Sequence, residues 1–144
     1  METKIISFGN HKGGVGKTTT TASVGSILAS KGYNVLLIDF DPQANLTFSM
    51  LGEDCEVSSY NSLVKREPLP RVRVSDHLEI VPSSLELEAA EMELISAISR
   101  ETILKRLLAP IKDEYDFILI DCRPSLTLLT MNAFAASTDI IVPL

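Results

Sequence analysis

The chain has 144 residues, of which 45% are hydrophobic, and a formal net charge of −6. This length suffices for one hydrophobic core, so we expect a single globular domain over residues 1–144. The acidic balance argues against binding to DNA or acidic membranes through bulk charge. Cys55 and Cys122 form no Cys-x-x-Cys pair, and no apolar stretch reaches the roughly 18 residues of a membrane span. We therefore expect a cytoplasmic protein without a membrane partner.

Short, β-branched apolar runs alternate with helical patterns along the chain. Strands are expected at residues 4–8, 34–38, 77–81, 117–120 and 139–143, and helices at residues 18–30, 84–96, 100–112 and 125–136. This alternation predicts an α/β fold with a mostly parallel sheet. The continuous apolarity of two of these runs is typical of central strands that are covered on both faces.

Two parts of the chain depart from this alternation. Residues 53–76 have weak periodicity, and we expect a variable excursion with one short helix near residues 60–64. The last expected strand is not followed by the helix that would cover a further crossover. A truncated chain, or a partner that completes the sheet, would account for this ending.

Residues 11–18 read His-Lys-Gly-Gly-Val-Gly-Lys-Thr and lie between an expected strand and an expected helix. Three glycines within four residues indicate close approach of the backbone to a bound group, and the helix N-terminus adds partial positive charge. In such a cradle Lys17 reaches the β- and γ-phosphates and the Thr18 hydroxyl ligates Mg²⁺. The standard pattern has glycine at His11; the match is to the variant Lys-Gly-Gly-x-Gly-Lys-Thr, which adds Lys12. The alternative is a plain glycine-rich turn with its lysines in solvent.

An acidic turn, Asp39-Phe40-Asp41-Pro42-Gln43, follows the second expected strand. Two carboxylates two residues apart point to the same side of an extended chain. One carboxylate would orient water bound to Mg²⁺, and the other would position the attacking water. The alternative is an ordinary strand-to-helix turn in which Asp41 caps a helix that begins near Pro42.

The run that ends at Asp121 has four apolar residues before the acid, which is the Walker B form. Its carboxylate holds Mg²⁺, usually through water. A buried strand that ends in aspartate for structural reasons alone is the alternative. The order of cradle, acidic turn and Walker B strand favours nucleotide hydrolysis. Cys122 is expected to be a small buried residue, because no base or metal partner for a reactive thiol is evident.

Together the three motifs resemble the deviant Walker A ATPases, and residues 39–45 resemble the ParA-type (Soj-like) partition ATPases in particular. Residues 121–126, 132–133 and 139–143 are similar to that family's second switch and its next strand. The resemblance implies a P-loop NTPase-like three-layer α/β/α fold, of which residues 1–144 are the N-terminal portion. It also implies a slow, partner-stimulated ATPase that acts in plasmid or chromosome partitioning.

The resemblance implies ATP and Mg²⁺ as cofactors and assigns the site residues. Phosphates would be held by Lys12, Gly13, Gly14, Val15, Gly16, Lys17, Thr18 and Thr19. The metal residues would be Thr18, Asp39 and Asp121. Lys12 would reach the partner's nucleotide across an ATP-dependent homodimer, and Asp41 would orient the hydrolytic water. Lys12 and Asp41 would be the catalytic residues.

The implied partners are a centromere-binding ParB-type protein and, in full-length members, non-specific DNA of the nucleoid. Members usually extend further, and their additional part supplies most of the adenine pocket and the basic DNA-binding surface. The shorter length is one departure from the family pattern. Arg123 is another, because the family usually has proline or a small residue at this position. A truncated, catalytically weak regulatory or interaction module is therefore an alternative, and a P-loop small-molecule kinase or ligase is another.

Overall fold

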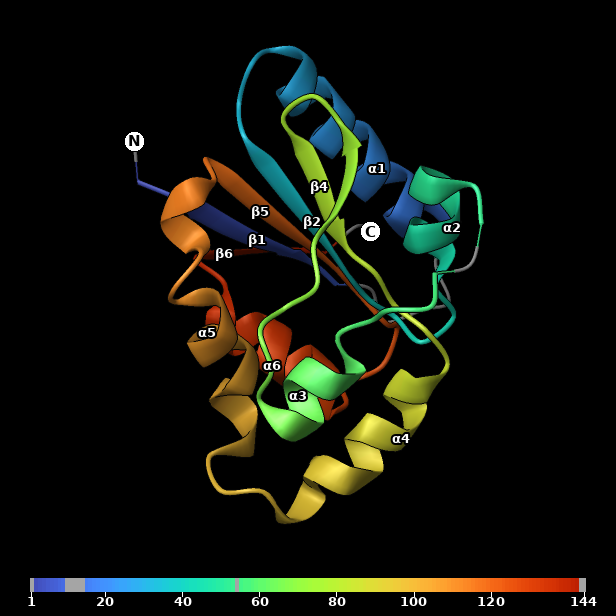
Figure 1. Cartoon of the computed structure of the whole chain (residues 1–144), viewed down its shortest axis with the longest axis vertical. Helices are drawn as coiled ribbons and strands as arrows, with labels where there is room; N and C mark the ends of the chain where they lie inside the picture. Colours follow the sequence, from blue (N-terminus) through green and yellow to red (C-terminus); the bar gives the residue numbers. More distant parts are fainter. Residues whose placement is uncertain (1, 10–14, 54, 143–144) are drawn as a thin grey trace.

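The computed structural model describes residues 2–9, 15–53 and 55–142. Its centre is a six-stranded sheet with the order β3-β4-β2-β5-β1-β6 (Figure 1). The strands are β1 (Lys4–Phe8), β2 (Val35–Phe40), β3 (Val72–Ser75), β4 (Leu78–Val81), β5 (Phe117–Cys122) and β6 (Asp139–Ile141). Every neighbouring pair is parallel except β3 and β4. The prediction of a mostly parallel sheet is confirmed.

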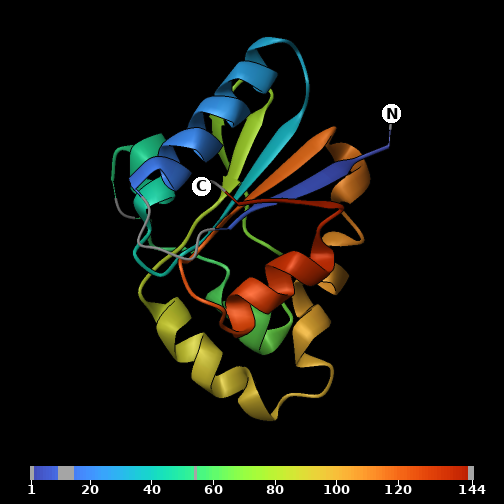
Figure 2. The ribbon, with the colours of Figure 1, turned by 180° about the vertical axis from the view of Figure 1, so that it is seen from behind.

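Helices cover both faces of this sheet. They are α1 (Val15–Ser30), α2 (Asn45–Leu51), α3 (Tyr60–Lys65), α4 (Glu86–Glu93), α5 (Ile103–Leu108) and α6 (Leu128–Ala136). The helices α1 and α2 lie on one face, and the other four lie on the opposite side, as the two views show (Figures 1 and 2). Short 3-10 turns occupy Leu94–Ser96, Arg100–Thr102 and Lys112–Glu114. The three-layer α/β/α prediction is confirmed.

Burial along β2 shows how the layers are held together. All six residues of this strand are buried, and the five hydrophobic ones alternate between two hydrophobic clusters. Val35 and Leu37 pack in the cluster that contains residues of α1 and α2, whereas Leu36, Ile38 and Phe40 pack in the cluster that contains residues of α3 to α6. A strand covered on both faces reads as a continuous apolar run. The predicted central position of this run is therefore confirmed.

Two elements were not expected from the sequence. The helix α2 follows the acidic turn, and β3 lies within the stretch interpreted as an irregular excursion. Residues of β3 alternate between partly buried and exposed, because this strand is at the sheet edge and pairs only with β4, in the antiparallel direction. His77 has a φ of 64° in the turn between them. The strand expected from this residue onward begins one residue later, at Leu78.

Several boundaries also differ from the prediction. The helix expected at residues 100–112 ends at Leu108, two residues before Pro110, which has no backbone N–H to continue the helical hydrogen bonds. The helix expected from Ser125 begins at Leu128. Conversely, α1 begins three residues earlier than expected, within the cradle motif. Both β2 and β5 run two residues further than expected, so Asp39 and Asp121 belong to the strands themselves.

The strand β6 forms the other edge of the sheet, next to β1. Ile140, Ile141 and Val142 are each close to half exposed. In the described ranges of the chain, no helix is long and apolar enough to cross a membrane.

Gly25 of α1 is packed tightly against the sheet. A methyl group added there would come within 2.7 Å of Leu37 Cδ2 and 3.6 Å of Leu119 Cδ1. We predict that Gly25→Val lowers the free energy of unfolding by about 1–3 kcal/mol, because the added atoms force the helix away from the sheet. Urea denaturation measures this loss. The control Ser26→Val, at an exposed neighbouring position, should change stability by no more than about 0.5 kcal/mol, and equal effects would contradict the prediction.

Candidate functional site

Three parallel strands bring the predicted motifs to one edge of the sheet. The central strand β5 pairs with β1 on one side and with β2 on the other. In this register Asp121 is the Cα partner of both Phe8 and Asp39. Phe8 precedes the cradle motif in the sequence, and Asp121 lies between Phe8 and Asp39 in the sheet. Carboxyl ends of parallel strands are the usual ligand-binding edge of such sheets.

The structure joins two of the predicted metal residues directly. The Thr18 hydroxyl donates a hydrogen bond of 2.9 Å to Asp121 Oδ2. Asp121 is fully buried, whereas Thr18, in the second turn of α1, is partly exposed. Two residues that are 103 positions apart in the sequence therefore bring side-chain oxygen atoms within hydrogen-bond distance of each other. Oxygen atoms are the ligands that Mg²⁺ prefers, and two adjacent ligands in its octahedral geometry lie about 2.9 Å apart. The residues present fit a bound Mg²⁺.

Asp39 lies beside this pair but faces protein groups. Its Oδ2 accepts hydrogen bonds from Thr47 N at 2.8 Å and Thr47 Oγ1 at 2.7 Å, and its Oδ1 accepts one from Asp41 N at 3.2 Å. Complete burial raises the pKa of Asp39 to about 7, the negative charge of Asp121 adds to the rise, and the hydrogen bonds from Thr47 and Asp41 oppose it. The effect of desolvation on the pKa is larger than the combined effect of the three hydrogen-bond donors.

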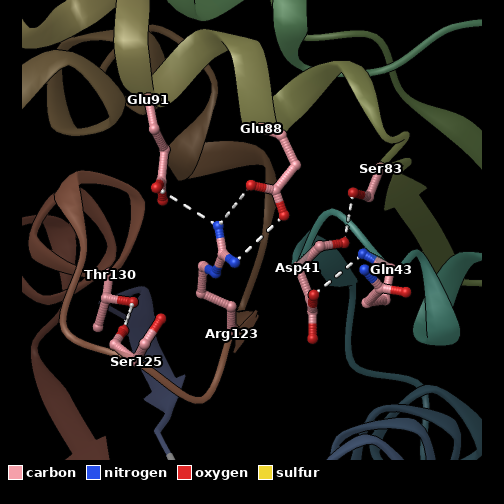
Figure 3. A network of polar contacts seen from close by, with 8 residues as sticks. All are labelled: Asp41, Gln43, Ser83, Glu88, Glu91, Arg123, Ser125 and Thr130. Carbon is pink, nitrogen blue, oxygen red and sulfur yellow. Dashed lines mark hydrogen bonds and ion pairs between the residues drawn. The ribbon is translucent and has the colours of Figure 1, made fainter.

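Asp41 occupies a tight turn after β2 and is 7% exposed. Its Oδ1 accepts a hydrogen bond from Gln43 N at 3.0 Å, and its carbonyl oxygen accepts one from Ser83 Oγ at 2.6 Å (Figure 3). The alternative interpretation, a helix that begins near Pro42 with Asp41 as its cap, is wrong. The helix α2 begins at Asn45, and its N-cap is Ala44 in the left-handed conformation. Asp41 instead closes a local turn of its own.

The phosphate cradle lies only partly within the described residues. Lys12, Gly13 and Gly14 lie outside them, so their expected roles stay predictions. Val15 to Lys17 form the start of α1, and Thr19 is exposed on its surface. The helix thus begins inside the motif. The first backbone N–H groups of a helix have no partner within it and are free to bind an anion at its N-terminus.

Arg123, the residue that departs from the family pattern, faces α4. Its Nη2 lies 3.2 Å from Glu88 Oε1 and its Nη1 lies 3.4 Å from Glu91 Oε2 (Figure 3). The two ion pairs attach the loop after β5 to a helix from another part of the chain. Cys122 beside it is buried in the core, as expected.

Three contributors to the site were not identified from the sequence. These are Thr47, Ser83 and the pair of glutamates on α4. No spacing rule finds them, because Thr47 is 36 residues from Ser83 and neither belongs to a phosphate or metal motif. Only the packing of α2 and the end of β4 against the acidic turn brings them into the site.

Comparison with known proteins identifies the family. Residues 3–144 match the family described as the AAA domain. The chain belongs to this family. It is 43% identical over 144 residues to the chromosome-partitioning ATPase Soj of Treponema pallidum, an alignment that covers 98% of this chain and 56% of that relative. The resemblance to the ParA-type partition ATPases is thereby confirmed.

Similar solved structures agree with the fold. Cobyrinic acid a,c-diamide synthase from Mycobacterium smegmatis, with a bound ATP analogue and magnesium, is 41% identical with a TM-score of 0.93 over 99% of this chain and 60% of that chain. A plasmid partition protein from Borrelia burgdorferi is 32% identical with a TM-score of 0.89 over 99% of this chain and 66% of that chain. The present chain therefore spans between about half and two thirds of the length of these proteins.

The raised pKa of Asp39 links its proton to stability. The unfolded carboxyl titrates near pH 3.9, as ordinary aspartates do. The native state therefore holds more protons between about pH 4 and pH 7, so ionisation of Asp39 makes the free energy of unfolding fall as the pH rises through this window.

We predict that carbon-detected NMR of the metal-free protein gives an Asp39 midpoint near pH 7. Thr47→Val should raise this midpoint, because it removes a hydrogen bond to the charged form, and Asp121→Asn should lower it, because it removes a like charge. Thr47→Ser, which keeps the hydroxyl, is the control and should leave the midpoint close to wild type. Shifts of the same sign in Thr47→Val and Asp121→Asn would contradict this account.

The two ion pairs of Arg123 should contribute unequally. The Glu91 side chain is 17% exposed and that of Glu88 is 51% exposed, so solvent screens the Glu88 pair more strongly. We predict that a double-mutant cycle of Arg123→Met with Glu88→Gln gives a coupling of about 0.2–1 kcal/mol, and that the cycle with Glu91→Gln gives a larger value. Urea unfolding measures both cycles. A smaller coupling for Glu91 than for Glu88 would show that exposure does not set the contribution.

Proposed function

We propose that this chain is the nucleotide-binding part of a ParA-type ATPase switch, which binds and hydrolyses ATP with Mg²⁺ and dimerises on ATP binding. The hydrogen bond between Thr18 and Asp121 is the single observation that carries the proposal. It joins Thr18 of the phosphate cradle to the Walker B acid, whose neighbour on the next strand is Asp39. A plain glycine-rich turn does not require this juxtaposition.

In this proposal the Thr18 hydroxyl and Asp121 hold Mg²⁺, with Asp39 behind them. The metal supplies positive charge that neutralises the phosphate oxygens during transfer. A cation held by Thr18 and Asp121 would also favour the ionised form of Asp39, which burial disfavours in the metal-free protein. The hydrogen bonds that Asp39 accepts from Thr47 and Asp41 would then stabilise its negative charge.

The nucleotide phosphates are bound by the amides of Gly13 to Thr19 and by Lys17, and Lys12 reaches the nucleotide of a second subunit. Asp41 orients the attacking water. A lysine supplied by a partner stabilises transition-state charge in the way an arginine finger does, so hydrolysis depends on dimerisation.

For the whole protein we propose a role in plasmid or chromosome partitioning in the cytoplasm. The partition functions printed for the similar Treponema and Borrelia proteins support this role. A centromere-binding ParB-type protein would stimulate hydrolysis, and binding to nucleoid DNA would require the longer chain. The net charge of −6 gives this part no bulk attraction for DNA.

We predict that Lys17→Ala abolishes ATP binding, because it removes the cation on the β- and γ-phosphates. Asp41→Ala should keep ATP binding but trap an ATP dimer without turnover. Equilibrium binding of a fluorescent ATP analogue, light scattering and phosphate release measure the three properties. Lys31→Ala, a lysine just after the end of α1, is the matched control and should behave as wild type. Unchanged hydrolysis in both Lys17→Ala and Asp41→Ala would refute the proposal.

A second candidate is a small-molecule ligase, because the similar Mycobacterium structure carries the name of a diamide synthase. Such an enzyme does not need Lys12 or the Asp-x-Asp-Pro-Gln turn, which favour the partition switch. ATP turnover that requires a carboxylic acid substrate and an amide donor would support the ligase. Turnover without them, increased by a ParB-type partner, would support the switch.

A further inference from the structure

Four buried residues form a closed ring of hydrogen bonds around the acidic turn. The Thr47 hydroxyl donates to Asp39 Oδ2 at 2.7 Å and accepts from Ser83 N at 2.9 Å. The Ser83 hydroxyl donates to the Asp41 carbonyl oxygen at 2.6 Å, and Asp41 N donates back to Asp39 Oδ1 at 3.2 Å. The ring connects β2, its following turn, α2 and the segment after β4.

The chemistry of the ring requires hydroxyl groups at two positions. Thr47 Oγ1 donates and accepts at the same time, and Ser83 contributes both its N–H and its O–H. Only a hydroxyl side chain of this size does both. Thr47 is 1% exposed and Ser83 is 2% exposed, so water has no access to replace a lost partner.

The ring fixes the backbone of Asp41 from both sides. Its N–H is bound to Asp39, and its carbonyl oxygen accepts from Ser83 Oγ and, at 2.9 Å, from Ala44 N. Its side chain is bound to Gln43 N through one oxygen, Oδ1 (Figure 3). The direction of the Asp41 carboxylate therefore depends on the hydroxyl of Ser83 and, through Ser83 N, on that of Thr47.

We propose that Thr47 and Ser83 are positioning residues for ATP hydrolysis, which hold the Asp41 carboxylate at the attacking water. This inference rests on the proposed function. Within the described part of the chain, Ser83 bonds to Thr47 and to the Asp41 carbonyl and to no metal residue, so its hydroxyl acts on the hydrolytic step and not on nucleotide affinity. Thr47 also bonds to Asp39, so its hydroxyl acts on both the acidic turn and the metal side of the site. An error of about 1 Å in the position of a reacting group costs up to about a hundredfold in rate.

The experiment compares Ser83→Ala, Thr47→Val and Thr47→Ser with wild type. Affinity for a fluorescent ATP analogue, kcat and KM for phosphate release, and hydrogen exchange at the amides of Gln43 and Ala44 are measured. Ser84→Ala is the matched control, since the Ser84 hydroxyl bonds to Ser58 and takes no part in the ring.

We expect Ser83→Ala and Thr47→Val to lower kcat by about ten- to a hundredfold, with faster exchange at the two amides. In Ser83→Ala the affinity for the ATP analogue should be unchanged, because Ser83 bonds to no metal residue among those that the structure describes. Thr47→Ser should restore kcat to within about threefold of wild type, because serine keeps both hydrogen bonds. Wild-type kcat in Ser83→Ala overturns the inference, and so does an equal loss of ATP affinity and kcat in that variant. If wild type itself hydrolyses no ATP, the proposed function fails first, and the inference fails with it.

Discussion

The position of β5 between β1 and β2 is the constraint on which the rest of the site depends. Because the three strands are parallel and in register, the residues at their carboxyl ends must meet at one edge. This register alone brings the cradle segment, Asp39 and Asp121 together. Each strand is covered by helices on both faces, so a shift of register would expose apolar side chains on both sides of the sheet.

That register also places two carboxylates side by side in the protein interior. Desolvation by burial is the main cause that raises the pKa of Asp39 to about 7, and the like charge of Asp121 adds to the rise. A bound cation and the hydrogen bonds from Thr47 act in the opposite direction. In the proposed function, a divalent cation would offset the repulsion and desolvation that disfavour two ionised carboxylates at this place.

The helix α4 is connected to both acidic segments. Ser83, in the segment that leads into it, bonds to the Asp41 carbonyl, and its glutamates bind Arg123 two residues after Asp121 (Figure 3). The helix and the segment before it therefore connect the loop after β2 to the loop after β5. The unusual arginine is thus a structural connection and not a free cation near the phosphates.

The sequence by itself determined the fold class, the two central strands, the family and the positions of the phosphate and metal motifs. Both signals are local in the sequence. A continuous apolar run follows from burial of a strand on both faces, and a glycine-rich turn follows from close approach of the backbone to a bound group. Only the tertiary structure decided that Thr18 meets Asp121, that Asp39 is buried against Thr47, and that Arg123 binds α4. These contacts join segments tens of residues apart, and α2 and β3 likewise depend on neighbours that no local pattern reveals. Long-range packing, rather than local propensity, sets the direction of each functional side chain.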